Sequence, residues 1–182
     1  MAENQNTAPA QEENGPQFAI QRIYLKDASL EMPHAPQIFL LQDAPEISIQ
    51  VDVEQTKLAD AEDLFEVVVR GTVTAKSKAN GQEQTVFLVE CKQAGIFFIH
   101  NIPQEHLPMI LGITCPAAIY PYLRSNVSDL LTRAGMPPVY MGEIDFQAMF
   151  AQRVQQEAMQ AQAAQAAQAA EANTVNGTGT AQ

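Results

Sequence analysis

The stretch from Leu64 to Ile99 constrains the fold most, because it combines two strand-like runs with a polar turn at Asn80-Gly81. In both runs, apolar residues, many of them β-branched or aromatic, recur at every second position. These residues are Phe65, Val67, Val69, Val73 and Ala75 in the first run and Phe87, Val89 and Cys91 in the second. A period of two is typical of strands that bury one face, so the stretch predicts an antiparallel hairpin.

The other parity of this hairpin mixes charged and apolar residues, with Glu66 and Arg70 in the first run and Leu88 and Glu90 in the second. An outward face of this kind is either the ordinary rim of a sheet or a docking surface. Scattered apolar residues are normal on protein surfaces, so the pattern alone favours the rim.

Two further strands precede the hairpin. Residues 18–32 alternate and end at Pro33, and residues 47–53 alternate as a second amphipathic strand. Asp27 and Glu31 share one parity, so we expect both on one face unless a bulge intervenes. Four strands in a row with short connections predict an antiparallel meander. Its exposed edges favour self-association.

The period becomes helical after Ile102. A first helical run starts near Leu107, and Pro116 and Pro121 are expected to break or kink it. A second helix is expected from Leu123 to Ala134, with Gly135 as its C-cap glycine, and a last helix is expected after Asp145 as N-cap. The predicted fold class is α+β: a four-stranded antiparallel β-meander followed by two or three α-helices.

The charge balance limits the kinds of binding partner, since the chain has 21 Asp and Glu but only 10 Lys and Arg, a net charge of −11. Nucleic acid is disfavoured because phosphate binding needs clustered cations. Between residues 27 and 66 only Lys57 opposes a concentration of acids. They are Asp27, Glu31, Asp43, Glu46, Asp52, Glu54, Asp60, Glu62, Asp63 and Glu66. They form either a well-solvated face or an acidic docking face.

The chain divides into a disordered tail at 1–16, a domain at 17–157 and an Ala/Gln-rich low-complexity tail at 158–182. The first residues lack a signal peptide's basic and apolar regions, and no apolar run is long enough to insert into a membrane. Cys91 and Cys115 lie in apolar contexts and are expected as buried thiols. We therefore expect a cytosolic protein.

Catalytic motifs are scarce. The three histidines form no metal-binding pattern, and no phosphate-binding or nucleophile motif occurs. An enzyme or small-ligand binder using Cys115 or His100 stays open as the alternative. Six Met and aromatic residues gather in the last loop and helix, where they form either ordinary core or an adaptable apolar binding groove. They are Met136, Tyr140, Met141, Phe146, Met149 and Phe150.

Five stretches, in this order, resemble the SecB family of bacterial protein-export chaperones. They read FAIQRIYLKDASLEMPHAP, LFEVVVRGTVTA, FLVECKQAGIF, GITCPAAIYPYLR and MPPVYMGEIDFQAMF, and together span most of residues 18–154. The resemblance implies a homotetramer built as a dimer of dimers. It also implies a cytosolic chaperone, not an enzyme, that works without ATP or a cofactor. Such a chaperone binds unfolded secretory precursors and delivers them to the ATPase SecA.

The resemblance also assigns site residues. SecA docking falls on Asp27, Glu31, Leu88 and Glu90, which would meet a short basic, zinc-binding tail of SecA, so the zinc would belong to the partner. The client-binding groove falls on the six Met and aromatic residues, between the sheet, the last loop and the last helix. The tail after about Glu157 and the first sixteen residues have no counterpart in the family pattern.

Overall fold

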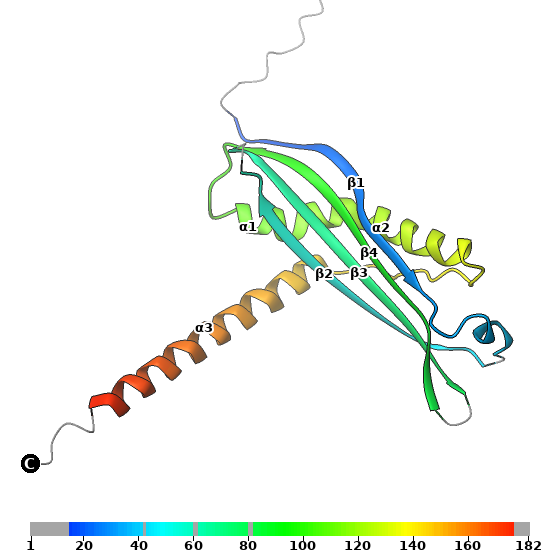
Figure 1. Ribbon diagram of the computed structural model, residues 1–182. Coiled ribbons are helices and arrows are strands. Elements are labelled where there is room, and N and C mark those ends of the chain that lie inside the picture. Colours follow the sequence, from blue (N-terminus) through cyan, green and yellow to red (C-terminus); the bar gives the residue numbers. More distant parts are fainter. Residues whose placement is uncertain (1–14, 42, 60–61, 80–81, 177–182) are drawn as a thin grey trace, which may run out of the picture. The chain divides into compact units, whose positions relative to one another are not determined.

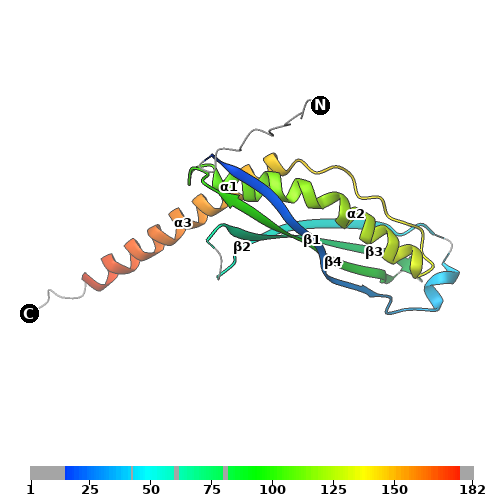
Figure 2. The same ribbon diagram turned by 90° about the horizontal axis from the view of Figure 1, so that it is seen from above.

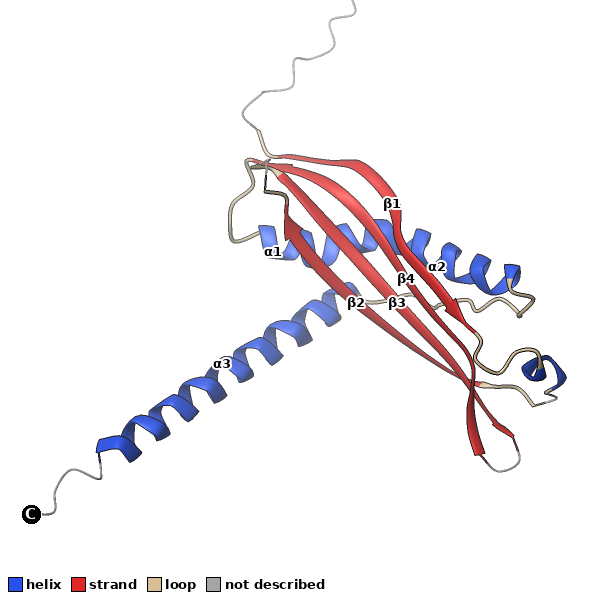
Figure 3. Cartoon of the chain, viewed as in Figure 1, coloured by secondary structure: helices blue, strands red, loops and turns tan. Residues whose placement is uncertain are grey.

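The structure is a computed structural model that describes residues 15–41, 43–59, 62–79 and 82–176. It consists of two units, residues 1–142 and residues 143–182, which we describe separately. The first unit holds a four-stranded sheet and a helical segment, and the second holds one helix (Figures 1 and 3). The strands are β1 (Gln17–Glu31), β2 (Glu46–Lys57), β3 (Leu64–Ala79) and β4 (Gln82–His100). The helical elements are η1 (Gln37–Leu40), α1 (Leu107–Met109), η2 (Ile110–Thr114), α2 (Cys115–Arg133) and α3 (Phe146–Asn176).

All neighbouring strands are antiparallel, as predicted, but the strand order is β1-β4-β3-β2. The predicted meander is therefore wrong in one respect, because β1 pairs with β4 and lies at the edge opposite β2. This order is a Greek key. Residues 32–45, which include η1, connect the two edge strands, and a connection of that length does not oblige them to pair as a tight turn does. The predicted turn at Asn80-Gly81 lies outside the described residues.

One face of the sheet packs against α2 (Figure 2). This covered face carries the apolar parity of the hairpin, and Val69, Val89 and Phe97 are completely buried there. The helix approaches closely: a Cβ at Gly71 would lie 3.1 Å from Leu123 Cδ2, and one at Gly95 would lie 3.0 Å from Ile119 Cγ2. The predicted hairpin and its buried parity are thus confirmed.

The helical segment runs on through both prolines. Residues 107–133 pass from α1 through the π-helical turn η2 into α2, and Pro121 lies inside α2. The predicted helix start near Leu123 was too late, because Pro116 fits the first turn and Pro121 costs a single backbone donor that tertiary packing offsets. The predicted helix end is confirmed: Gly135 has φ 78°, and the amide of Met136 donates to the Leu131 carbonyl at 3.0 Å in a Schellman motif.

The helix of the second unit, α3, starts where the sequence predicts the last helix. The amide of Ala148 donates to Asp145 Oδ1 at 2.9 Å, which confirms Asp145 as the N-cap of α3. Arg153 Nε and Glu157 Oε1, one turn apart, lie 2.9 Å from each other. The helix continues to Asn176, although its Ala/Gln-rich part offers no apolar stripe. None of the helices in the described ranges is long and apolar enough to cross a membrane.

Candidate functional site

The face of the sheet opposite α2, which we call the open face, brings the four predicted docking residues together. Across β1 and β4, Glu31 pairs with Leu88, Ser29 with Glu90, and Asp27 with Lys92. Residues that pair across neighbouring strands project to the same face. Asp27, Glu31, Leu88 and Glu90 therefore form one patch on two adjacent strands, which we call the docking patch.

A bulge decides which face the acids of β1 occupy. The register of β1 against β4 shifts between Leu25 and Asp27, so the strand's alternation changes there. The shift comes before both acids, and Asp27 and Glu31 keep the common face that their parity predicts. Sequence alternation counted from Phe18 does not locate this shift.

The docking patch gathers three carboxyl groups around one leucine. Asp27 and Glu31 are exposed, whereas Leu88 and Glu90 are half-buried. The ammonium group of Lys92 lies 3.7 Å from Glu90 Oε1. Three carboxylates and an apolar side chain within one patch match a ligand that presents cations beside an apolar group.

Next to the docking patch, β3 contributes a second cation. Arg70 pairs in register with Lys92, and its Nη2 lies 3.1 Å from Asp52 Oδ2 on β2. The hydrogen bond to Asp52, together with the charges of Asp52, Glu90 and Glu54, raises the pKa of Arg70 above its usual range. Arg70 Nε is buried without a hydrogen-bond partner.

A polar cluster that the sequence did not reveal braces the open face. The Tyr24 hydroxyl on β1 donates to the Glu66 carboxylate on β3, so the pair spans β4, and Lys26 Nζ lies 2.7 Å from Glu66 Oε2. Burial, then the hydrogen bond to Glu66 and its charge, raises the pKa of Tyr24 to about 12. Burial opposes the charge of Glu66, but the hydrogen bonds from Lys26 and Tyr24 outweigh it and lower the pKa of Glu66.

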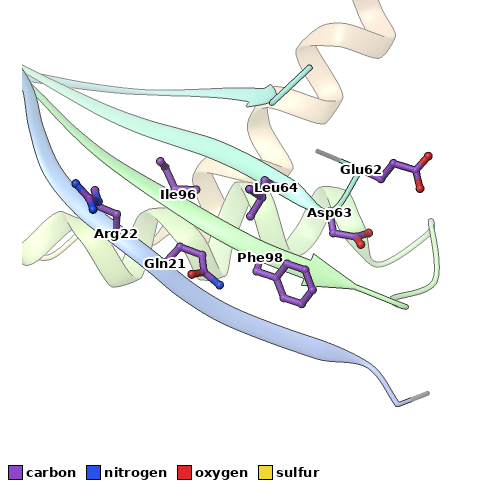
Figure 4. Close-up of a pocket in the computed structure, with 7 residues that line it drawn as sticks. All are labelled: Gln21, Arg22, Glu62, Asp63, Leu64, Ile96 and Phe98. Carbon is purple, nitrogen blue, oxygen red and sulfur yellow. The ribbon is translucent and has the colours of Figure 1, made fainter. Parts of the chain in front are cut away.

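At the other end of the open face the sheet is hollowed (Figure 4). The hollow has a volume of about 570 Å³ and an apolar floor of Leu64, Ile96 and Phe98. Acidic and basic groups rim it: Glu62 and Asp63 precede β3, and Arg22 comes from β1. Asp63 Oδ2 lies 2.8 Å from His100 Nδ1, within hydrogen-bond distance, and the His100 ring stacks on Phe98.

The two cysteines do not support a nucleophile. Both are buried. Burial, and then the charge of Asp27, raises the pKa of Cys91 to about 11, and burial raises the pKa of Cys115 to about 12. Both side chains are therefore neutral thiols near pH 7, and the thiolate is the reactive form. His100, the other residue of the enzyme alternative, pairs with Asp63.

The six Met and aromatic residues differ sharply in exposure. In the first unit, Met141 is 1% exposed and Tyr140 is 80% exposed, and the Tyr120 hydroxyl anchors the loop by donating to the Gly142 carbonyl at 2.6 Å. Met136 is half-buried. In the second unit, Phe146 is buried, and Met149 and Phe150 are half-buried. Met141 behaves as core, which was one of the two predicted possibilities, while Tyr140 is freely accessible.

Comparisons with known proteins identify relatives of the chain. The sequence pattern of the family described as "Preprotein translocase subunit SecB" matches residues 11–157. Protein-export protein SecB of Burkholderia vietnamiensis is 55% identical over 144 residues, which cover 79% of this chain and 87% of that protein. The protein of the same name from Burkholderia multivorans is also 55% identical over 144 residues, covering 79% of this chain and 86% of that protein.

A solved structure shares the fold. A SecB-like chaperone of Mycobacterium tuberculosis, in complex with a ChAD peptide from an antitoxin, superposes with a TM-score of 0.57 at 20% identity. The superposition covers 70% of this chain and 91% of that one. With the family pattern and the 55% identical relatives spanning most of the sequence, the chain belongs to the SecB family of protein-export chaperones.

Proposed function

We propose that the protein holds unfolded secretory precursors in the cytosol, without ATP or a cofactor, and passes them to SecA. Its family membership supports a role in protein export, and the raised pKa values of both buried thiols argue against nucleophilic chemistry. The function is then binding rather than turnover. Two separate surfaces divide the work, one for SecA and one for precursors.

The docking patch is the proposed SecA surface. One observation supports it above all: the register brings Asp27, Glu31, Leu88 and Glu90 from two strands onto one exposed face. Complementary charges steer a partner and fix its orientation, and reversing one of them opposes binding because it places like charges together. A basic, zinc-binding tail of SecA fits this chemistry, and the zinc stays with SecA.

The proposed client-binding residues lie in the last loop of the first unit and, separately, on α3 of the second unit. Tyr140 is the accessible anchor of the loop, with Met136 half-buried beside it in sequence, and Met149 and Phe150 are half-buried on α3. Met and aromatic side chains adapt to varied apolar segments because they are flexible or amphipathic. Met141 and Phe146 are buried, so they would contact a client only after moving.

Assembly would add avidity. We propose a homotetramer formed as a dimer of dimers. Within the described residues, no strand pairs with the outer edge of β1 or of β2. The covered-face side of β1 also exposes Phe18, Ile20 and Leu25, each between 41% and 49%. Open strand edges beside apolar side chains favour association with another copy of the chain. Several weak contacts spread over one assembly would then bind an unfolded precursor more tightly than any single contact could.

The segment boundaries predicted from composition are part of the proposal: residues 17–157 would carry both functions, and the tails at 1–16 and 158–182 would not be needed. A truncated chain of residues 17–157 should suppress precursor aggregation as the full chain does. Loss of that activity on truncation would assign the tails a role in client binding.

The function is tested by following the aggregation of a chemically unfolded precursor as it is diluted into the protein without ATP. Suppression by the wild type is expected, together with weaker suppression by Tyr140→Asp. Tyr122→Asp is the matched control, since Tyr122 is 51% exposed on α2. Equal suppression by wild type and Tyr140→Asp would remove the loop from the client surface, and no suppression by the wild type would refute the chaperone function itself.

A further inference from the structure

Lys92 is a cation placed among the acids of the docking patch. Its strand β4 puts it directly opposite Asp27 of β1, and its Nζ lies 3.7 Å from Glu90 Oε1. The side chains of Lys92 and Glu90 are each about one-third exposed, at 32% and 33%. Lys92 therefore contacts one acid of the docking patch and is the cross-strand neighbour of a second, so it lies where a cation of a bound basic ligand would also be attracted.

The neighbouring cation keeps Lys92 on the acidic side. Arg70 pairs in register with Lys92 on the far side from Asp27, and Asp52 holds its guanidinium at 3.1 Å. Like charges on directly opposed residues repel each other. Repulsion from Arg70 on β3 is relieved, and attraction to Glu90 on β4 is satisfied, when the ammonium group of Lys92 lies over the docking patch.

We infer that Lys92 is an internal competitor that limits the affinity of the docking patch for its basic partner. This inference rests on the proposed docking of SecA. In the free protein Lys92 neutralises one of the three carboxylates of the docking patch. A basic ligand has to displace Lys92 from Glu90, or bind with its own cation close to that ammonium group. Release of the partner is made easier by the same competition.

A charge series at position 92 tests the inference by calorimetry with purified SecA at low and physiological salt. Lys92→Gln should bind about threefold to tenfold more tightly than wild type, the size expected for removing one like charge a few ångströms away near the surface. Lys92→Glu should bind more tightly still, and Lys92→Arg should resemble wild type. The gain should shrink as salt rises, because screening weakens interactions between exposed charges.

A matched variant separates local from global charge. Lys57→Gln removes the same charge from β2, where Lys57 projects to the covered-face side opposite Phe65, and its affinity should stay within about twofold of wild type. Equal gains for Lys57→Gln and Lys92→Gln would overturn the inference, since net charge alone would then explain them. Weaker binding by Lys92→Gln would also overturn it and would show that Lys92 contacts the partner favourably.

The test also distinguishes failure of the inference from failure of the proposed function. If wild type binds SecA and all variants at position 92 bind it with the same affinity, the proposed SecA docking is retained and the competitor role of Lys92 is wrong. If neither wild type nor any variant binds SecA, the proposed docking is refuted and the competitor role with it. Thermal unfolding of each variant is the control for loss of fold. The melting temperature should stay close to that of wild type, because Lys92 is on the open face and not in the core.

Discussion

The two faces of the sheet are built from alternate residues of the same strands, yet they are organised by different forces. On the covered face, residues such as Val89 and Phe97 are fully buried under α2 and leave little room for change. On the open face, their neighbours Leu88 and Phe98 are half-buried among carboxylates and cations. The comparison teaches that the covered parity of each strand specifies the fold, while the open parity buries residues such as Val68 and Ala94 but also presents exposed charges that can carry recognition.

Adjacent phenylalanines give the strongest test of this difference. Phe97→Ala should lower the free energy of unfolding by about 3–5 kcal/mol, because it opens a cavity in the core. Phe98→Ala should cost about 1 kcal/mol, because its ring is half-exposed over the hollow. Urea unfolding followed by circular dichroism measures both. Similar losses for the two variants would contradict the claim that the covered face contributes more to the free energy of unfolding than the open face.

The brace between Tyr24, Lys26 and Glu66 is the point where the open face also contributes stability. Glu66→Gln should lower the free energy of unfolding by about 1–2 kcal/mol, since it weakens hydrogen bonds to a charged group that is largely buried. The side chain of Glu66 is only 13% exposed. A loss as large as that of Phe97→Ala would mean that the open face is as rigidly specified as the core.

The same brace predicts a dependence on pH. The pKa of Glu66 is lowered in the folded chain, so folding favours its carboxylate. That stabilisation is complete above the usual carboxyl pKa and is lost as the pH falls through the lowered value. Wild type should therefore lose its advantage over Glu66→Gln in acid. An advantage that stays constant from neutral to acidic pH would contradict the assigned ion pair.

The smallest effect is expected at the exposed end of the hairpin. Lys76 Nζ and Glu83 Oε1 lie 2.7 Å apart, but their side chains are 48% and 57% exposed. Lys76→Gln should leave the melting temperature unchanged within error, because exposed pairs lose to solvent and salt most of what they gain. A clear drop in the melting temperature would show that exposed ion pairs contribute to the stability of this end of the hairpin, away from the packed core.

Local features of the fold were predictable from the sequence, because local chemistry fixes them. The alternation of Val67, Val69 and Val89, the N-cap Asp145 and the C-cap glycine Gly135 all depend on a few neighbouring residues. The position of β1 beside β4 was not predictable, because alternation states which face a residue takes and not which strand it joins. The continuation of α2 through Pro121 likewise depends on tertiary packing.

The candidate site divides in the same way. Parity placed Leu88 and Glu90 on the open face, and the register then brought Asp27 and Glu31 beside them. The Tyr24–Glu66 bond across β4 joins residues of β1 and β3 that are far apart in the sequence. Such contacts leave no periodic signal in the sequence, so only the structure reveals them.

The most direct test of the two-surface account is a charge reversal at Glu90, read out by SecA calorimetry and by aggregation suppression of an unfolded precursor. Glu105→Lys is the control, since Glu105 is 81% exposed outside the sheet. The account predicts that Glu90→Lys abolishes SecA binding and leaves aggregation suppression intact, while Glu105→Lys changes neither. Undiminished SecA binding by a folded Glu90→Lys protein would contradict it.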